Sequence, residues 1–219
     1  MNDRKISDST VRRLSLYLNL LRELSAADDE VVSSLQLAEG SGTTAAQVRK
    51  DLSHFGSFGK RGQGYRVSEL HDRIRDILGL EGTHRVSVVG TGKIGSALLG
   101  YRDLRERGFE IVSAFDTDPD KAGREVFGVP VYPMDDLEGK LRADGVDIVI
   151  IATPPAAAQE VADRVAAAGV EGILSFAASK LQLEVPIAMR WMDVALELEG
   201  LSFLMSNVAH GPRSIEESA

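Results

Sequence analysis

Three glycines, Gly90, Gly92 and Gly95, have the spacing by which a backbone turn binds the pyrophosphate of a dinucleotide. They follow the apolar run Val86–Val89, which predicts a strand, and they open a stretch with helical periodicity. In such a turn the first glycine permits the sharp bend, the second lets the phosphates approach, and the third lets the helix pack against the strand. N–H groups at the start of the helix would bind the phosphates. The residues that we expect to contact a cofactor here are Gly90, Thr91, Gly92, Lys93, Ile94 and Gly95.

An acidic residue follows this loop at the distance that ribose recognition requires. Asp116 ends the next expected strand, 21 residues after Gly95, and the pattern for NAD places an acid about 20 residues on. Its carboxylate would bind the ribose hydroxyls of NADH or NAD⁺ and would repel the 2′-phosphate of NADP. Two alternatives remain, namely a glycine-rich turn without a ligand and a site for another nucleotide such as coenzyme A.

Another expected strand ends at Thr153 and Pro154. In open α/β sheets ligands lie beyond the carboxyl ends of the strands, so these two residues are candidates to flank the cofactor. A rigid loop that only ends the strand explains them equally well.

A local excess of positive charge lies between Gln47 and Arg66 in an otherwise acidic chain. This stretch holds five basic residues and one acid, a charge of +4, whereas the whole chain carries −8. A short helix, a turn at 40–42 and a second helix opened by a Thr44–Gln47 capping box predict a helix-turn-helix, and a glycine-rich hairpin at 57–67 predicts a wing. A helical cap with a solvated basic face is the alternative. Candidates for contacts with DNA are Gln47, Arg49 and Lys50 in the second helix and Lys60 and Arg61 at the tip of the hairpin.

These two groups of residues fall in parts of the chain that differ in pattern. Before residue 80, apolar spacing predicts short helices, including a first one through 11–21 and a last one capped by Ser68. After residue 80, strands alternate with helices, which predicts an α/β fold with a mostly parallel sheet. The expected strands are 85–89, 110–115, 129–132, 147–152 and 172–176, and the expected helices are 93–104 and 157–168. We therefore expect a DNA-binding domain at 1–80, a nucleotide-binding domain at 81–192, and a C-terminal helix with a tail at 193–219.

The C-terminal segment carries apolar residues at alternating spacings of four and three. This heptad pattern predicts a helix that pairs with another helix, and a dimer would let two recognition helices bind two DNA half-sites. A terminal helix packed on its own domain is the alternative. The residues of the pattern are Val194, Leu198, Leu201, Met205 and Val208.

Composition excludes several classes of site. The chain has no cysteine, which excludes disulfides, thiolate zinc sites and thiol redox switches. Its four histidines show no metal-ligand spacing, so we expect no metal. A polar start and the lack of an apolar run of about 18 residues predict neither a signal peptide nor a membrane span, hence a cytoplasmic protein. We expect no enzyme, because only about a third of the chain follows the turn at Thr153, too little for a substrate domain, and it carries a single histidine, His210; an NAD-dependent dehydrogenase is the alternative.

Four segments together resemble the Rex family of redox-sensing transcriptional repressors. They are Gln47–Gly56 with Gly59, Arg61, Gly62, Gly64 and Tyr65; the loop Gly90–Gly95; Phe115–Pro119; and Leu201–Phe203. The resemblance covers nearly the whole chain. It implies a winged helix, a Rossmann domain and a swapped C-terminal helix, in a homodimer that binds palindromic operator DNA and releases it when NADH binds.

The same resemblance implies roles for single residues. Arg49, Lys50 and Arg61 would contact DNA, and Tyr101 and Asp193 would form a pair across the dimer that responds to the cofactor. The residues expected at the switch and dimer contact are Tyr101, Asp193, Val194, Leu198, Leu201 and Met205, and Tyr101 is also expected to contact the cofactor. The chain departs from the family pattern at four positions. Asn19 replaces an arginine that a relative pairs with the counterpart of Asp193, Val194 replaces an aromatic residue that covers the nicotinamide, and Ser175 and Ala178 replace an asparagine and a proline.

Overall fold

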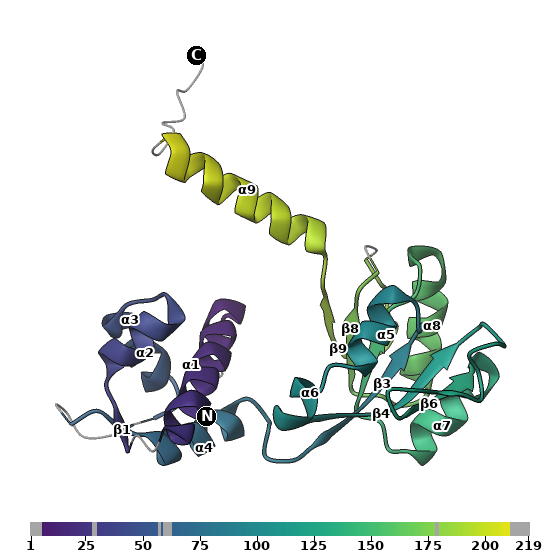
Figure 1. The fold of residues 1–219 in the computed structure, drawn as a ribbon, viewed down its shortest axis with the longest axis horizontal. Coiled ribbons are helices and arrows are strands. Elements are labelled where there is room, and N and C mark those ends of the chain that lie inside the picture. Colours follow the sequence, from purple (N-terminus) through teal and green to yellow (C-terminus); the bar gives the residue numbers. More distant parts are fainter. Residues whose placement is uncertain (1–5, 28–29, 57, 59–62, 178–179, 211–219) are drawn as a thin grey trace. The chain divides into compact units, whose positions relative to one another are not determined.

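The chain divides into two compact units, Met1–Gly82 and Thr83–Ala219 (Figure 1). A computed structural model describes residues 6–27, 30–56, 58, 63–177 and 180–210. In this part of the chain no helix has the length and the apolar character that crossing a membrane requires. The two units are described separately below.

The first unit is mainly helical. Its elements are α1 (Asp8–Ala26), β1 (Val31–Val32), α2 (Ser34–Ser41), α3 (Ala45–Ser53), β2 (Tyr65–Arg66) and α4 (Val67–Ile77). Helix α1 packs against α2 and α4, and α2 packs against α3. The core is formed by the apolar faces of these helices, with Leu14, Leu37, Val48 and Ile74 all fully buried. The helices are therefore held by one shared core, as amphipathic helices of this length require.

Local signals in the sequence fix the ends of α2 and α3. Ser33 and Gln36 form a complete capping box at the start of α2, and Gly42 ends that helix in the left-handed conformation at φ +65°. Thr44 caps α3 by accepting a hydrogen bond from the backbone N–H of Gln47 at 3.1 Å. Two helices joined by a short glycine turn result, as the helix-turn-helix prediction requires.

Two details of the first unit differ from expectation. Ser68 does not cap the last helix, because α4 already begins at Val67 and its N-cap is Arg66. Strand β2 pairs antiparallel with β1, with Val31 opposite Arg66, a pairing that the sequence pattern did not predict. The expected hairpin tip with Lys60 and Arg61 lies outside the described residues.

The second unit contains, in its described part, a seven-stranded sheet with helices on both faces. In sheet order the strands are β5 (Glu125–Val126), β6 (Val129–Pro133), β4 (Phe109–Asp116), β3 (His84–Val89), β7 (Ile148–Ile151), β8 (Gly172–Ser175) and β9 (Ala188–Trp191). Every neighbouring pair is parallel except β5 and β6. This is the strand order of a Rossmann fold, in which winding reverses at β3 and the binding crevice lies beyond the carboxyl ends of β3 and β7.

Alternate residues of the central strands enter two separate cores. Val149 and Ile151 of β7 pack with α7 (Leu137–Ala143) and α8 (Pro155–Ala167), whereas Ile150 packs on the other face with Leu99 of α5 (Lys93–Leu99). Successive residues of a strand point to opposite faces, so a strand covered on both sides must be apolar throughout. The α/β fold with a mostly parallel sheet is confirmed.

Several elements of the second unit differ from the predicted pattern. The single helix expected over 93–104 is two helices, α5 and α6 (Asp103–Glu106), which Gly100 separates. A Cβ atom at Gly100 would lie 3.1 Å from the ring of Phe127, which is a tight contact. The sequence pattern also missed α7 and the edge strand β9, which is short and largely exposed.

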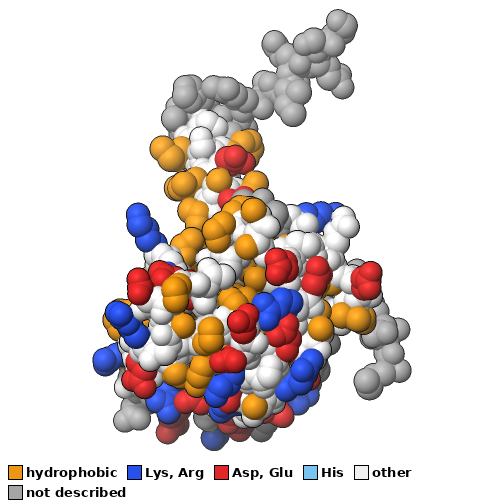
Figure 2. All heavy atoms as spheres, turned by 90° about the vertical axis from the view of Figure 1, so that its right-hand side faces the viewer, with side chains coloured by type: hydrophobic (Ala, Val, Ile, Leu, Met, Phe, Trp, Pro, Cys, Tyr) orange, Lys and Arg blue, Asp and Glu red, His pale blue; other side chains and the backbone are white. Residues whose placement is uncertain are grey.

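The last element is α9 (Val194–His210). Asp193 caps it, because its Oδ1 atom accepts a hydrogen bond from the N–H of Ala195 at 2.9 Å. Apolar side chains are exposed on more than one face, including Val194 at 60% and Phe203 at 66%. Figure 2 shows such side chains, in orange, on the visible part of this helix below the grey C-terminal residues.

Candidate nucleotide site and nucleic-acid interface

The turn after β3 depends on its three glycines for different reasons. Gly90 has a φ of +93°, and a Cβ atom there would lie 2.8 Å from the carbonyl oxygen of Ala152. A Cβ atom at Gly95 would lie 1.9 Å from the carbonyl oxygen of Gly90, so the protein's own backbone excludes any side chain. At Gly92 a Cβ atom would have no neighbour within 4 Å among the described residues. The first and third glycines thus serve the fold, and the second leaves space outside the turn.

Asp116 lies beside this turn and is held by four hydrogen bonds. Its Oδ2 atom accepts from the N–H of Thr91 at 2.8 Å, from the Thr91 hydroxyl at 2.5 Å and from Lys121 Nζ at 3.0 Å. Its Oδ1 atom accepts from the N–H of Asp118 at 2.9 Å. Burial raises the pKa of Asp116, but hydrogen bonds from Thr91, Asp118 and Lys121 outweigh it and lower the pKa to about 2. The carboxylate is therefore ionised at neutral pH.

Sequence reasoning missed Lys121. Its side chain is 39% exposed and also lies 3.9 Å from Asp118 Oδ2. A lysine five residues after an acid is not a recognisable motif. The turn at 118–122, which places Lys121 beside Asp116, is visible only in the structure. Because the Thr91 donors are buried, Lys121 is the donor to Asp116 that a ligand can most easily displace.

The remaining residues predicted for the cofactor lie around the same edge of the sheet. Lys93 and Ile94 are exposed in the first turn of α5, and Pro154 is the N-cap of α8. Thr153 Oγ1 is buried and has no hydrogen-bond partner among the described residues. An orphaned hydroxyl next to Gly90, open space at Gly92 and an ionised acid at the next strand fit a dinucleotide.

Helix α3 presents the predicted DNA contacts unequally. Arg49 and Lys50 are exposed, and Arg49 Nη1 donates a 2.9 Å hydrogen bond to Ser34 Oγ at the start of α2. Gln47 is half-buried, and its amide nitrogen donates to Asp51 Oδ1 at 2.8 Å. The expected capping box at Thr44 is therefore only half formed, because a buried carboxylate is a stronger partner for the Gln47 side chain than the backbone of Thr44.

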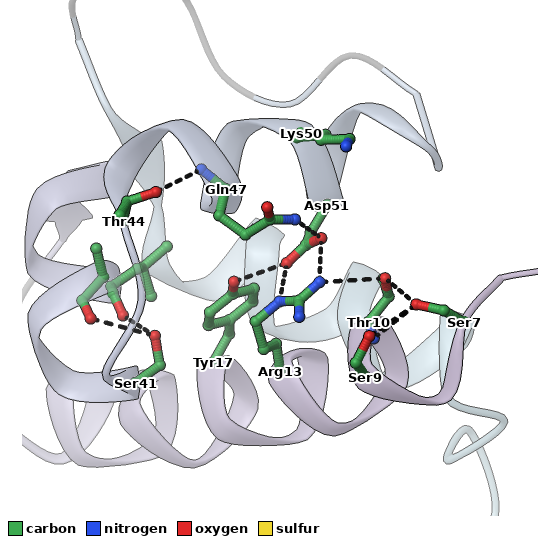
Figure 3. Close-up of polar contacts among 12 residues, drawn as sticks. Ser7, Ser9, Thr10, Arg13, Tyr17, Ser41, Thr44, Gln47, Lys50 and Asp51 are labelled. Carbon is green, nitrogen blue, oxygen red and sulfur yellow. Dashed lines mark hydrogen bonds and ion pairs between the residues drawn. The ribbon is translucent and has the colours of Figure 1, made fainter. Parts of the chain in front are cut away.

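Asp51 is the centre of a polar cluster that sequence reasoning did not find (Figure 3). Its side chain is 1% exposed. Arg13 binds it with two hydrogen bonds, from Nε at 2.6 Å and from Nη2 at 2.7 Å, and the Tyr17 hydroxyl donates at 2.9 Å. Burial raises the pKa of Asp51, but the donors Arg13, Gln47 and Tyr17 outweigh it, so the pKa is lowered. A signal existed, since Asp51 occupies a buried position beside Leu52 on the apolar face of the helix.

Both units are similar to known protein families. The first unit matches the family described as "Putative DNA-binding protein N-terminus" over residues 5–53, and the second matches the family described as "CoA binding domain" over residues 81–179. The redox-sensing transcriptional repressor Rex of Carboxydothermus hydrogenoformans is 48% identical over 199 residues, which are 91% of this chain and 96% of that protein. The chain belongs to the Rex family.

Solved structures of a Rex-family repressor, RSP, share the fold of this chain over 93% of its length. Its complex with NAD⁺ and operator DNA has a TM-score of 0.86 at 32% identity, covering 93% of this chain and 94% of RSP. Its complex with NADH has a TM-score of 0.82 at 31% identity, covering 94% and 97%. The predicted resemblance to the Rex family and the predicted fold class are thus confirmed.

Residues that the Rex resemblance marks for the switch lie at exposed or half-buried positions. Tyr101 follows α5 and is 51% exposed, and Asp193 caps α9. Asn19 lies on α1, where its Oδ1 atom accepts a 3.3 Å hydrogen bond from Arg22. The pairing of Tyr101 with Asp193 across a dimer stays a prediction.

The described residues contain no group of three or more histidine, aspartate or glutamate side chains with metal-site geometry. Two candidate sites emerge from this part of the chain, one formed by the glycine turn with Asp116 and the other by α3 with its neighbours.

Proposed function

We propose that this chain is a homodimeric repressor that NADH releases from palindromic operator DNA, so that transcription follows the NADH/NAD⁺ ratio. The observation that carries the proposal is the similarity to RSP, a Rex-family repressor whose structures contain NADH in one case and NAD⁺ with operator DNA in the other. A repressor of this kind acts in the cytoplasm. The nicotinamide serves as a redox-dependent ligand, and we propose no catalytic residue.

Each part of the chain has a role in this proposal. Residues 1–80 bind DNA through Gln47, Arg49, Lys50, Lys60 and Arg61. Residues 81–192 hold the dinucleotide. Residues 193–219 hold the two subunits together through α9, whose exposed apolar side chains need a partner surface to be covered.

In the second unit the glycine turn and two polar groups would hold the cofactor. The open space at Gly92 suits the pyrophosphate, and the ionised Asp116 suits the ribose hydroxyls. Thr153 Oγ1 supports a polar contact with the cofactor, because it has no partner among the described residues. Lys93, Ile94 and Pro154 complete the site. When bound, the nicotinamide supplies a ring that is charged in NAD⁺ and neutral in NADH.

Release of DNA requires that NADH prefers one dimer arrangement over another, because a ligand with equal affinity for both shifts nothing. Moving a population from 1:99 to 99:1 takes about 5.5 kcal/mol. Two bound cofactors can share this free energy, so each must bind the DNA-free arrangement about 2.7 kcal/mol, or about 100-fold, more tightly than the DNA-bound one.

An electrophoretic mobility shift assay tests this function directly. The probe is a palindromic duplex that the full-length protein enriches from randomised DNA. We expect the bound fraction to fall as the NADH:NAD⁺ ratio rises at constant total nucleotide. A bound fraction that stays the same at every ratio would contradict the proposal.

Arg49→Ala is expected to weaken binding to that duplex by about 1–3 kcal/mol, because Arg49 is exposed on α3 and its fork geometry suits a guanine edge. The affinity for NADH should stay at the wild-type value, since Arg49 lies in the first unit. Fluorescence anisotropy with labelled DNA and a separate NADH titration measure the two. Arg105→Ala is the control, since Arg105 is 80% exposed on α6 of the second unit. Equal losses in the two variants would remove Arg49 from the interface.

Lys121→Met is expected to lower the affinity for NADPH about tenfold and to leave the affinity for NADH equal or higher. Lys121 now occupies a lone pair of Asp116 and is the nearby positive charge that a 2′-phosphate would meet. Calorimetric titration with both nucleotides measures the ratio of affinities. Arg105→Met, which removes a positive charge near Glu110 at the opposite end of β4, is the control. The same change for both nucleotides would contradict this role of Lys121.

A second candidate ligand is coenzyme A, which the family description of residues 81–179 favours. The ionised Asp116 disfavours it, because the 3′-phosphate of coenzyme A would meet a negative charge at the ribose position. Titration with NADH and with coenzyme A separates the two, and tighter binding of coenzyme A would overturn the assignment of Asp116 to an unphosphorylated ribose.

A further inference from the structure

The Asp51 cluster uses every acceptor position of a buried carboxylate. Oδ1 accepts from Arg13 Nη2 and Gln47 Nε2, and Oδ2 accepts from Arg13 Nε and the Tyr17 hydroxyl. An ionised carboxylate has about four acceptor positions and no donor. Each neighbour must therefore face Asp51 with a donor atom.

This requirement fixes the orientation of the Gln47 side chain. The amide can face a carboxylate only with its nitrogen, so its oxygen must point the other way. Figure 3 shows the amide oxygen of Gln47 directed away from Asp51. That oxygen accepts no hydrogen bond from the described residues. The bond to Asp51 uses one of the two N–H donors of the amide, and the acceptor oxygen is the part of the amide that points away from the carboxylate.

The oxygen belongs to a part of α3 that solvent can reach. Gln47 and Lys50 are three residues apart, so they are neighbours on the helix surface. Both line an open hollow of about 500 Å³ beside the first turn of α1, together with His54. Lys50 is exposed, whereas Asp51 is fully buried and cannot contact DNA itself.

We propose that Gln47 recognises the exocyclic amino group of adenine or cytosine in the major groove with its amide oxygen, and that Asp51 is the positioning residue that fixes this polarity. The inference rests on the proposed DNA-binding function. In the major groove only these two bases present an amino donor, whereas guanine and thymine present carbonyl acceptors at the corresponding edge. Arg13 contributes by keeping Asp51 ionised and immobile, so that helix α1 holds the amide of α3 in place.

The experiment compares base preferences of full-length variants on a pool of randomised duplexes, read by sequencing the bound fraction. We expect the wild type to prefer adenine or cytosine over guanine or thymine at one position of each half-site by about fivefold or more. Gln47→Met should reduce that preference to about twofold or less and leave the other positions unchanged. Asp51→Asn should change the preference at the same position, although residue 51 is buried. An asparagine side chain has N–H donors as well as an acceptor oxygen, so it no longer fixes the orientation of the Gln47 amide.

Tyr17→Phe is the matched control. It removes one hydrogen bond from the same carboxylate, at Oδ2, and leaves the bond from Gln47 to Oδ1. We expect lower thermal stability and the wild-type base preferences. The variant that combines Gln47→Met with Asp51→Asn should have the preferences of Gln47→Met alone, since Asp51 acts only through Gln47.

A second probe tests the contact if Asp51→Asn does not fold. Removing the exocyclic amino group from the preferred base of a selected duplex should weaken wild-type binding about fivefold and leave binding of Gln47→Met unchanged. The proposal is overturned if Gln47→Met keeps every base preference, if loss of the amino group affects both proteins equally, or if Tyr17→Phe changes the preference as Asp51→Asn does. If the wild type enriches no sequence at all, the DNA-binding function fails instead.

Discussion

Gly92→Val is expected to weaken NADH binding by about 100-fold or more and to leave the protein on operator DNA at NADH concentrations that release the wild type. A Cβ atom at this position would meet nothing within 4 Å among the described residues, and the φ of −68° is ordinary for valine. The loss falls on the ligand, since the branched side chain would fill the space that the pyrophosphate needs. An NADH titration followed by fluorescence measures it.

Two further variants separate the ligand from the fold. Gly139→Val places the same side chain at an open position of α7 and should leave NADH affinity unchanged. Gly95→Ala should instead destabilise the unit, because its Cβ atom would lie 1.9 Å from the Gly90 carbonyl oxygen. For Gly92→Val we expect the free energy of unfolding to change by less than about 1 kcal/mol, the usual scale of an N-cap substitution. Wild-type NADH affinity in Gly92→Val would place the cofactor elsewhere.

Arg13→Leu is expected to lower the free energy of unfolding of the first unit by about 3–5 kcal/mol at pH 7. Removing one partner of a buried ion pair leaves the other charge uncompensated, and the Asp51 side chain is only 1% exposed. Urea unfolding followed by circular dichroism measures the loss. Arg12→Leu, at an exposed position of the same helix, is the control for the loss of an arginine from α1.

The same variant predicts a pH dependence of definite sign. In the wild type the pKa of Asp51 is lowered, so its contribution to stability is present above the unfolded pKa of about 3.9 and is lost as pH falls through the lower folded value. Without Arg13, burial is less opposed and raises the folded pKa of Asp51. Arg13→Leu should therefore gain stability relative to the wild type as pH falls from 7 toward 4, or regain folded structure if it is unfolded at pH 7. A difference in stability that stays the same across this range would contradict the buried ion pair.

The parts of the fold that sequence predicted depend on short-range rules. The turn Gly90–Gly95 and Asp116 follow from a motif in which each residue has one mechanical role, and the structure has the packing that this motif needs at Gly90 and Gly95. Helices α2 and α3 begin where Ser33 and Thr44 can cap them. Such signals involve residues three or four apart, so they can be recognised without knowing the fold.

The parts that sequence did not predict depend on long-range contacts. The bond between Arg13 and Asp51 joins residues 38 apart, and no pattern within either helix specifies it. Helix α5 ends at Gly100, beside the distant residue Phe127, and β9 forms as a strand by pairing with the edge of β8. The Gln47 side chain does not take its predicted capping role for the same reason. It binds the carboxylate of Asp51 instead, and that carboxylate is held by Arg13 only because α1 packs against the other helices.

The central claim is that the cofactor sets the separation of two DNA-binding units. The chain has no cysteine, so Glu39→Cys, at an exposed position on α2, allows one spin label per subunit. Pulsed electron paramagnetic resonance then measures the distance between the two labels in the dimer. We predict one distance distribution with saturating NADH and a different one with NAD⁺ and the palindromic duplex. Identical distributions in the two states would contradict the claim.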